Sequence, residues 1–166
     1  MSTAYAAPGP LTPIITNGWG EERSWTLDSY RARGGYLGLE KARAMDPADI
    51  VAAVKDSGLR GRGGAGFPSG LKWSFLPPAD GGPRYLVVNA DESEPGTCKD
   101  IPLIMGNPHV LIEGIAITSR AIGCDHAFVY LRGEVTHVYR RLLSAVREAT
   151  EAGVLGDLRI TAHAGA

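Results

Sequence analysis

The 166-residue chain contains only two cysteines, Cys98 and Cys124. So few cysteines can form neither a scaffold of several disulfides nor a metal site with four cysteine ligands. The sequence is also almost neutral, with 17 lysines and arginines against 18 aspartates and glutamates, and a net charge of −1. This balance argues against a nucleic acid or an anionic membrane surface as partner, because both attract basic proteins.

A long uninterrupted apolar run is lacking as well. The best candidate, residues 111–122, is interrupted by Glu113 and Arg120 and is shorter than the roughly 20 residues that a spanning helix needs. The first basic residue is Arg23, so the start does not show the basic and apolar regions of a signal peptide. We therefore expect no direct membrane insertion and a cytoplasmic, reducing location.

The composition that is present indicates an ordinary globular domain. Hydrophobic residues make up 44% of the chain and charged residues 21%. Residues 1–25 are rich in proline, glycine, serine and threonine without periodicity, which predicts an irregular arm. Residues 26–166 are long enough to form one α/β domain with its own core.

Hydrophobic periodicity predicts an α/β fold in which N-terminal helices precede alternating strands and helices. Strand character covers residues 85–89, 127–131 and 158–164, and helical periodicity covers residues 109–123 and 136–153. Capping and stop residues predict earlier helices over residues 26–34, 46–58 and 68–77. A strand–helix–strand–helix–strand order is typical of a parallel sheet with right-handed crossovers.

Two apolar patterns predict how these elements are covered. The first strand, YLVVN, is continuously apolar over four residues, which predicts coverage on both of its faces. The last predicted helix carries an apolar stripe formed by Val138, Leu142, Leu143, Val146 and Ala149. We expect this stripe to face the core.

Residues 58–73, GLRGRGGAGFPSGLKW, hold six glycines among arginines, a lysine and aromatic residues. So much backbone freedom costs entropy on folding, which raises the possibility that a ligand approaches the backbone closely. The loop contains G-x-G-x-x-G from Gly61 to Gly66, but a helix rather than a strand precedes it, unlike a dinucleotide fingerprint. A Walker loop fails because Leu71 separates Gly70 from Lys72. A plain connecting turn and an RNA-binding Arg-Gly-Gly segment remain as alternatives.

Residues 89–100, NADESEPGTCKD, form a second candidate site at the carboxyl end of the first predicted strand, where open α/β sheets bind ligands. Its polar residues include Asn89, Asp91, Glu92 and Ser93. An EF-hand that begins at Asp91 is excluded, because a proline stands where the loop needs its last glutamate. Paired-carboxylate hydrolysis and a solvated turn remain as alternatives.

Together, GLRGRGGAGFPSGLKWSF and VVNADESEPGTCKD, followed by NPHVLIEG and YLRGE, closely resemble the family of flavoprotein subunits of NADH-quinone oxidoreductases, the flavin-bearing NADH-oxidising subunits of respiratory complex I. The likeness covers roughly residues 26–166. It implies the N-terminal part of a truncated, Rossmann-like FMN-binding domain. Flavoprotein subunits of NAD-reducing hydrogenases and formate dehydrogenases share these motifs, so such a subunit is the alternative.

The resemblance implies a site for FMN, with NADH as substrate. The cofactor-binding residues that it implies are Gly61, Arg62, Gly63, Gly64, Lys72, Asn89, Asp91, Glu92 and Ser93. Phe67 and Phe75 would offer stacking faces to NADH, with packing inside the protein as the alternative for both. Hydride transfer belongs to the cofactors, so we expect no catalytic side chain and no metal ligand in this chain.

The resemblance also implies parts that this sequence does not contain. The family continues after Ala166 with a tyrosine and a Gly-Glu-Glu segment, and later with cysteines that hold a 4Fe-4S cluster, and Ile101 stands where many relatives carry arginine. We therefore expect a truncated chain whose partners are other subunits of a multisubunit oxidoreductase, especially an iron–sulfur subunit that passes electrons towards quinone. Such a chain would lie on the cytoplasmic side of the membrane through these partners. A non-catalytic RNA-binding or interaction fragment that uses Arg60 and Arg62 is the alternative from another class.

Overall fold

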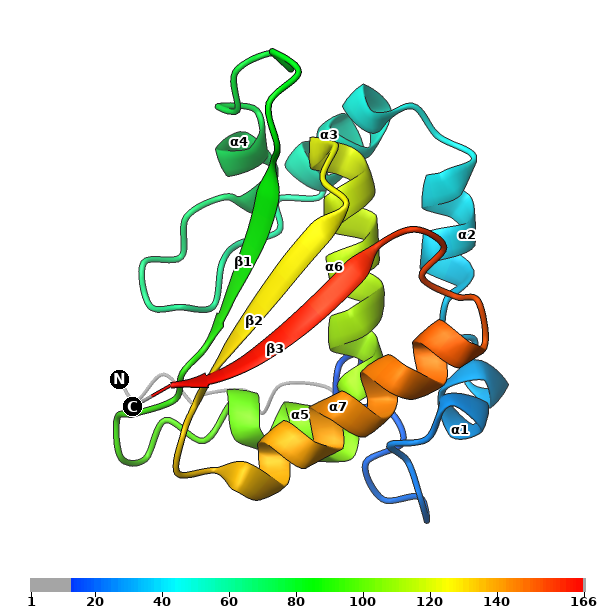
Figure 1. Ribbon diagram of the computed structural model, residues 1–166, viewed down its shortest axis with the longest axis vertical. Coiled ribbons are helices and arrows are strands. Elements are labelled where there is room, and N and C mark those ends of the chain that lie inside the picture. The colour runs from blue at the N-terminus through cyan, green and yellow to red at the C-terminus, as the bar shows by residue number, and fades with distance from the viewer. Residues whose placement is uncertain (1–12, 166) are drawn as a thin grey trace, which may run out of the picture.

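The computed structural model describes residues 13–165 and shows an α/β arrangement, in which four short helices precede a three-stranded parallel sheet (Figure 1). The helices are α1 (Leu27–Ala32), α2 (Leu37–Arg43), α3 (Pro47–Asp56), α4 (Ser69–Trp73), α5 (Asp100–Gly106), α6 (Pro108–Ile122) and α7 (Thr136–Glu151). The strands are β1 (Tyr85–Ala90), β2 (His126–Arg132) and β3 (Arg159–Gly165). The predicted α/β class, with N-terminal helices ahead of a parallel sheet, is confirmed.

The sheet has the strand order β1-β2-β3, and both pairs are parallel. In its register, Val87 lies opposite Phe128, which in turn lies opposite Thr161. Helices α5 and α6 connect β1 to β2, and α7 connects β2 to β3. The carboxyl ends of all three strands therefore lie along the same side of the sheet, and the loops that follow them lie close together.

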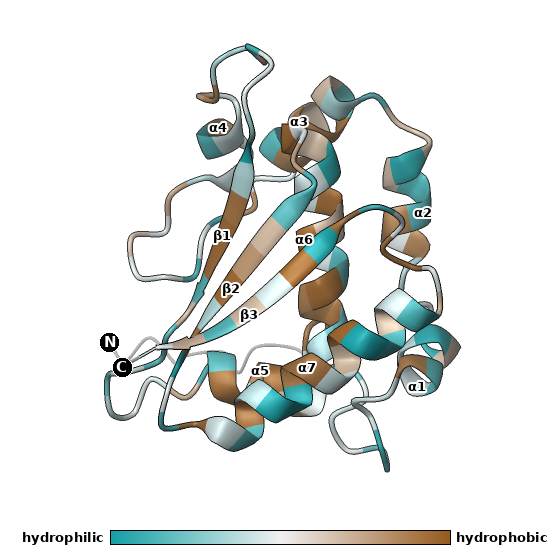
Figure 2. Cartoon of the chain, viewed as in Figure 1, coloured by the Kyte–Doolittle hydropathy of each residue, from teal (hydrophilic) through white to brown (hydrophobic). Residues whose placement is uncertain are grey.

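The core lies between one face of the sheet and the helices α6 and α7. Ala127, Val129 and Leu131 of β2 are fully buried, while the residues that alternate with them are half-buried. They share one apolar cluster with Ile112 of α6 and Leu142 of α7. Figure 2 shows the hydrophobic residues concentrated along α6 and the middle of the strands. Because the strands lie in the sheet in the same order as in the chain, right-handed crossovers place both helices on the same face.

The other face of the sheet is open over β1, so the predicted coverage of this strand on both faces is wrong for residues 13–165. Tyr85 and Val87 are 55% and 67% exposed. The reason is the strand order, which brings both crossover helices to the opposite face. In α7, Leu143 also differs from the predicted stripe and is 41% exposed, whereas Ala145 is buried in its place.

Local capping rules located three of the four N-terminal helices, including α4, which follows Pro68 but ends at Trp73, before the predicted end near Pro77. The Thr26 side chain accepts a hydrogen bond from the backbone N–H of Ser29 at the start of α1. Pro47 occupies the first position of α3, as predicted, although the side chain of Asp46 before it makes no capping hydrogen bond. The sequence did not predict α2 or α5, and neither has a side chain at its own N-cap position that caps it. Before α1, residues 13–25 form turns; residues 1–12 of the predicted arm lie outside the described residues.

Helices α5 and α6 meet at a sharp bend. Among residues 13–165, no single helix is long and apolar enough to cross a membrane, although α5 and α6, bent by 102° relative to each other, pass that test as a pair. Ile112 and Ile115 of α6 are buried in the core of this structure.

A buried carboxylate on α6 supplies the cap that α2 lacks. Glu113 is 9% exposed, and its Oε1 accepts a hydrogen bond from the Leu39 N–H at 2.9 Å. Its Oε2 accepts from the Tyr36 N–H at 2.9 Å and from the Tyr30 hydroxyl. Tyr36 has a left-handed backbone with φ 67°, so the chain turns sharply into α2 above this carboxylate. Burial, and next the carboxylate of Glu113, raise the pKa of Tyr30.

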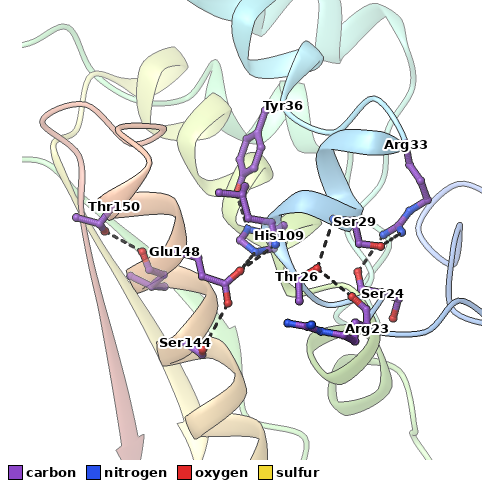
Figure 3. A network of polar contacts seen from close by, with 12 residues as sticks. Arg23, Ser24, Thr26, Ser29, Arg33, Tyr36, His109, Ser144, Glu148 and Thr150 are labelled. Carbon is purple, nitrogen blue, oxygen red and sulfur yellow. Dashed lines mark hydrogen bonds and ion pairs between the residues drawn. The ribbon is translucent and has the colours of Figure 1, made fainter.

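The same network continues through a buried histidine to α7 (Figure 3). The Tyr36 hydroxyl lies 2.8 Å from His109 Nδ1, and His109 Nε2 lies 3.4 Å from Glu148 Oε2. That oxygen of Glu148 also accepts from the Leu27 N–H at 2.9 Å. The network therefore ties α1 and α2 to the two helices that cover the sheet.

We predict that Glu113→Ala lowers the free energy of unfolding by on the order of 3 kcal/mol, because three buried donors lose their acceptor. Urea unfolding followed by circular dichroism measures this loss. The matched control is Glu134→Ala, which removes an exposed ion pair to Arg132 and should cost less than about 1 kcal/mol. Equal losses in the two variants would show that Glu113 does not cap α2.

We also predict a pH dependence of stability that originates at His109. Burial lowers the pKa of this imidazole in the folded chain, against the opposing effect of Glu148. Between the ordinary value of about 6.5 and the lowered value, the unfolded chain binds the proton and the folded chain does not. The free energy of unfolding should therefore fall as the pH drops below about 6.5. His109→Gln should flatten this slope, whereas His137→Gln, at an exposed position, should retain it.

Candidate functional site

The glycine loop is fixed at its base and open at its tip. Arg60 and Pro68 form an antiparallel bridge, and the Gly61 N–H donates to the Phe67 carbonyl at 2.9 Å. The Arg60 guanidinium donates to the Gly66 carbonyl at 3.0 Å. Gly66 has a φ of 62°, which a residue with a side chain rarely adopts. The loop therefore has a defined shape although its tip packs on little.

The carboxyl end of β1 leads into the second candidate segment. The Asn89 side-chain oxygen accepts from the Asp91 N–H at 2.9 Å, which turns the chain as it leaves the strand. Ser93 Oγ lies 2.9 and 2.8 Å from the two carboxylate oxygens of Asp91. Asp91 and Ser93 are exposed, so both groups also remain open to a ligand.

Glu92 points inward, unlike its neighbours, and is 8% exposed. Its Oε1 accepts from the N–H groups of Lys99 at 2.6 Å and Asp100 at 3.1 Å, and its Oε2 accepts from the Ile101 N–H at 2.9 Å. Desolvation acts to raise the pKa of Glu92, but these backbone hydrogen bonds outweigh it and lower the pKa. Glu92 thus caps α5 and closes residues 92–101 into a compact loop.

The two candidate segments meet in a single cavity of about 420 Å³. Figure 1 shows the glycine-rich segment beside β1, near the carboxyl end of that strand. The cavity is lined by Arg62, Gly63, Gly64, Asn89, Asp91, Glu92, Ser93, Glu94, Thr97, Lys99 and Asp100. The structure therefore brings together every predicted cofactor-binding residue except Gly61 and Lys72.

The remaining predicted residues lie around the loop rather than in the cavity lining. Gly61 stands at the loop base, and Lys72 lies on α4, which follows the loop. The rings of Phe67 and Phe75 have centroids 6.2 Å apart at an angle of 54°, and they are 45% and 66% exposed. The two rings thus contact each other but keep much of their surface open to solvent.

Sequence reasoning missed some of the residues around the cavity. Thr97, Lys99 and Asp100 line it because Glu92 folds their segment back over the end of β1. Arg132, at the end of β2, donates to the Ser93 carbonyl at 3.2 Å. The parallel sheet brings Arg132 there, and its place in YLRGE at the end of a predicted strand was the available indication.

The cavity combines carboxylates with cations. Lys99 is paired with Asp100, whereas no hydrogen bond or ion pair of the Arg62 guanidinium occurs within residues 13–165. Hydroxyl and carboxylate groups at Asp91 and Ser93 suit a ligand with several hydroxyls, and Arg62 suits an anionic group. Among the described residues, no cluster of histidine, cysteine, aspartate or glutamate could hold a metal ion.

Comparison with known sequences shows which family these motifs belong to. Residues 54–166 match the family model described as the Nuo51 FMN-binding domain. The chain is 63% identical to the F subunit of the NADH-quinone oxidoreductase of Streptomyces coelicolor over 164 residues, which covers 94% of this chain and 36% of that protein. It is 57% identical to the protein of the same description in Mycobacterium tuberculosis, covering 95% and 39%. The chain thus spans little more than a third of the length of these relatives.

A solved structure resembles the chain as well. A chain in the crystal structure of an NAD+-reducing NiFe-hydrogenase in the air-oxidised state superposes with a TM-score of 0.71. The two are 33% identical, and the match covers 93% of this chain and 25% of that chain.

We predict that the Glu92 cap holds the cavity in shape. Glu92→Ala should lower the free energy of unfolding by about 2–3 kcal/mol, because three backbone N–H groups lose a charged acceptor. Glu94→Ala, at an exposed residue of the same loop, should change it by less than about 0.5 kcal/mol. Chemical denaturation of both variants measures the difference, and equal effects would contradict this role of Glu92.

Proposed function

We propose that the cavity binds FMN, starting from the premise that this chain belongs to the family of the Nuo51 FMN-binding domain and of the F subunits of NADH-quinone oxidoreductases. The observation that carries the proposal is the meeting of the glycine loop and the 89–100 segment in one cavity at the carboxyl end of β1. Open α/β sheets bind their ligands at that end. The cavity volume lies within the range of roughly 300–1,000 Å³ that is usual for small-molecule sites.

The open backbone at the loop tip supports this proposal. A Cβ atom added at Gly63 or Gly64 would meet nothing within 4 Å, so both residues border open space. A planar ring can therefore lie directly against the peptide groups. Arg62 would pair with the ribityl phosphate, and Asn89, Asp91 and Ser93 would hydrogen-bond the ribityl hydroxyls.

Bound FMN supplies the acceptor for a hydride from NADH, and this chain's residues position the reactants. Arg62 and Lys72 place positive charge near the loop, where it favours phosphate and the negative charge of reduced flavin. Phe67 and Phe75 keep exposed ring faces beside the loop and would stack on NADH. Glu92 acts indirectly, by holding the segment that carries Asp91 and Ser93.

The relatives favour a role in an NADH-quinone oxidoreductase. Identity to the relatives of that description reaches 63%, against 33% and 43% for chains in two structures of NAD+-reducing NiFe-hydrogenase. In this role, electrons would pass from FMN to iron–sulfur centres of the remaining chain and of a partner subunit, and then to quinone, on the cytoplasmic side of the membrane. A flavoprotein subunit of an NAD-reducing hydrogenase is the second candidate, because the hydrogenase chain shares the fold.

Titration of FMN, followed by flavin fluorescence and absorbance, tests the proposal. The titration uses this chain and an extended chain, in which residues 1–166 continue into the part of the Streptomyces coelicolor relative that follows its matched region. We expect much weaker binding by the 166-residue chain than by the extended chain, because contacts worth about 2.7 kcal/mol change affinity a hundredfold. Failure of both chains to bind FMN would overturn the proposal.

Gly63→Val should weaken FMN binding by the extended chain at least about tenfold, a loss of about 1.4 kcal/mol. The new side chain enters open space, so it should occupy the cavity without straining the fold. Gly20→Val is the matched control, because a Cβ at Gly20 also meets nothing within 4 Å and Gly20 does not line the cavity. Unchanged affinity in Gly63→Val would show that the ligand does not lie against the loop tip.

A further inference from the structure

An arginine at the end of β2 holds the main chain of the candidate site from outside the cavity. Arg132 is the last residue of β2, and its Nη1 donates to the carbonyl oxygen of Ser93 at 3.2 Å, across 39 residues of sequence. Ser93 lines the cavity, whereas Arg132 does not. The guanidinium therefore acts on the wall of the cavity without being part of its lining.

The sheet register explains why Arg132 lies there. The parallel pairing of β1 with β2 ends where Ala90 lies opposite Leu131, and one more step in the same register brings Asp91 level with Arg132. Opposite charges at neighbouring positions of adjacent strands attract each other. The carboxylate of Glu134, and to a smaller extent that of Asp91, raise the pKa of Arg132. The cation thus lies beside Asp91 as well as Ser93.

Glu134 fixes the direction in which Arg132 donates. Its Oε2 accepts from the Nε of Arg132 at 2.8 Å, and its Oε1 accepts from Nη2 at 3.3 Å. Two parallel hydrogen bonds hold the planar guanidinium in one orientation. The third nitrogen, Nη1, is then directed at the Ser93 carbonyl.

The pair of side chains carried by this segment has few other supports. The Ser93 hydroxyl and the Asp91 carboxylate bond to each other, and both residues are exposed. Glu92 holds residues 99–101, further along the segment. Within residues 13–165, the bond from Arg132 is the only hydrogen bond that the main chain of Ser93 makes. Loss of Arg132 would therefore free the residue that carries the hydroxyl.

We propose that Arg132, held by Glu134, is a positioning residue of the flavin site, which orients the Asp91–Ser93 pair towards the ribityl hydroxyls without contacting the cofactor. The inference rests on the proposed function, which assigns those hydroxyls to Asp91 and Ser93. A group that is already oriented loses less conformational freedom when a ligand binds. An exposed ion pair contributes little to folding, so Arg132 should affect flavin affinity more than stability.

Arg132→Gln in the extended chain tests this role. FMN should bind about tenfold more weakly, because the Asp91–Ser93 pair must then be ordered during binding. The midpoint of urea unfolding should stay nearly unchanged. The matched control is Arg147→Gln, which removes the same charge from an exposed ion pair with Glu151 on α7 and should leave FMN affinity unchanged.

Titration with riboflavin shows which part of the cofactor depends on Arg132. Riboflavin has the ribityl hydroxyls of FMN but no phosphate. Arg132→Gln should therefore weaken the binding of riboflavin and FMN by the same factor. Arg62→Gln, at the proposed phosphate partner, should weaken the binding of FMN alone. A loss confined to FMN in Arg132→Gln would mean that Arg132 pairs with the phosphate, which overturns the proposal.

A double-mutant cycle shows whether Arg132 acts through Ser93. Residues that act as one unit have non-additive effects on a binding free energy. In a chain that already carries Ser93→Ala, Arg132→Gln should weaken FMN binding by less than about threefold. A second full tenfold loss would show that Arg132 acts independently of Ser93 and would overturn the proposal.

The carbonyl carbon-13 chemical shift of Ser93 reports the same contact without a ligand. In the 166-residue chain it should move in Arg132→Gln and stay in place in Arg147→Gln; an unmoved shift in Arg132→Gln overturns the proposal. The unmodified extended chain separates the two ideas. If it binds no flavin, the proposed function fails and this inference fails with it. If it binds FMN and Arg132→Gln binds FMN equally well, this inference alone fails.

Discussion

The parallel pairing of β1, β2 and β3 in chain order is the constraint on which the rest of this structure depends. Right-handed crossovers in that order place α6 and α7 on one face and bury Ala127, Val129 and Leu131 beneath them. The same pairing places the carboxyl ends of all three strands side by side, so Arg132 of β2 reaches the Ser93 carbonyl. The strand order thus determines where the core forms, which face of the sheet stays exposed and where the polar loops lie.

Two buried carboxylates fix the starts of α2 and α5, which the strand pairing alone does not determine. Glu113 caps α2 across 74 to 77 residues of sequence, and Glu92 caps α5 from seven to nine residues away. A carboxylate can be buried at such a position because several N–H donors replace its water, and the helix dipole favours a negative charge there. In each case the capped helix begins next to a segment of irregular chain. Glu113 thereby anchors the N-terminal helices, and Glu92 shapes the cavity wall.

These remote caps explain which parts of the structure the sequence could predict. Helices α1, α3 and α4 were found because Thr26, Pro47 and Pro68 lie beside the ends that they define. The capping groups of α2 and α5 come from Glu113 and Glu92, which no local pattern connects to these helices. On the face of β1 beneath α6, Leu86 and Val88 are partly buried against the core, in the direction that the apolar run predicted. On the other face Val87 is exposed, since burial there depends on elements that a local pattern cannot specify.

The candidate site, too, was predictable from the sequence only in part. Asn89, Asp91 and Ser93 were predicted because they lie at or just after the carboxyl end of a strand, and the glycine loop because of its composition. Their meeting in one cavity is a tertiary fact: it needs the bridge between Arg60 and Pro68 on one side and the Glu92 cap on the other. The glycine loop itself makes few contacts at its tip, so the folded chain alone offers little to offset the entropy of ordering it. A ligand that binds only the folded state stabilises it in proportion to the logarithm of its concentration. The proposed site therefore combines two parts of different character. The segment between β1 and α5 is held rigidly by hydrogen bonds, whereas the glycine loop can adapt its backbone to a ligand.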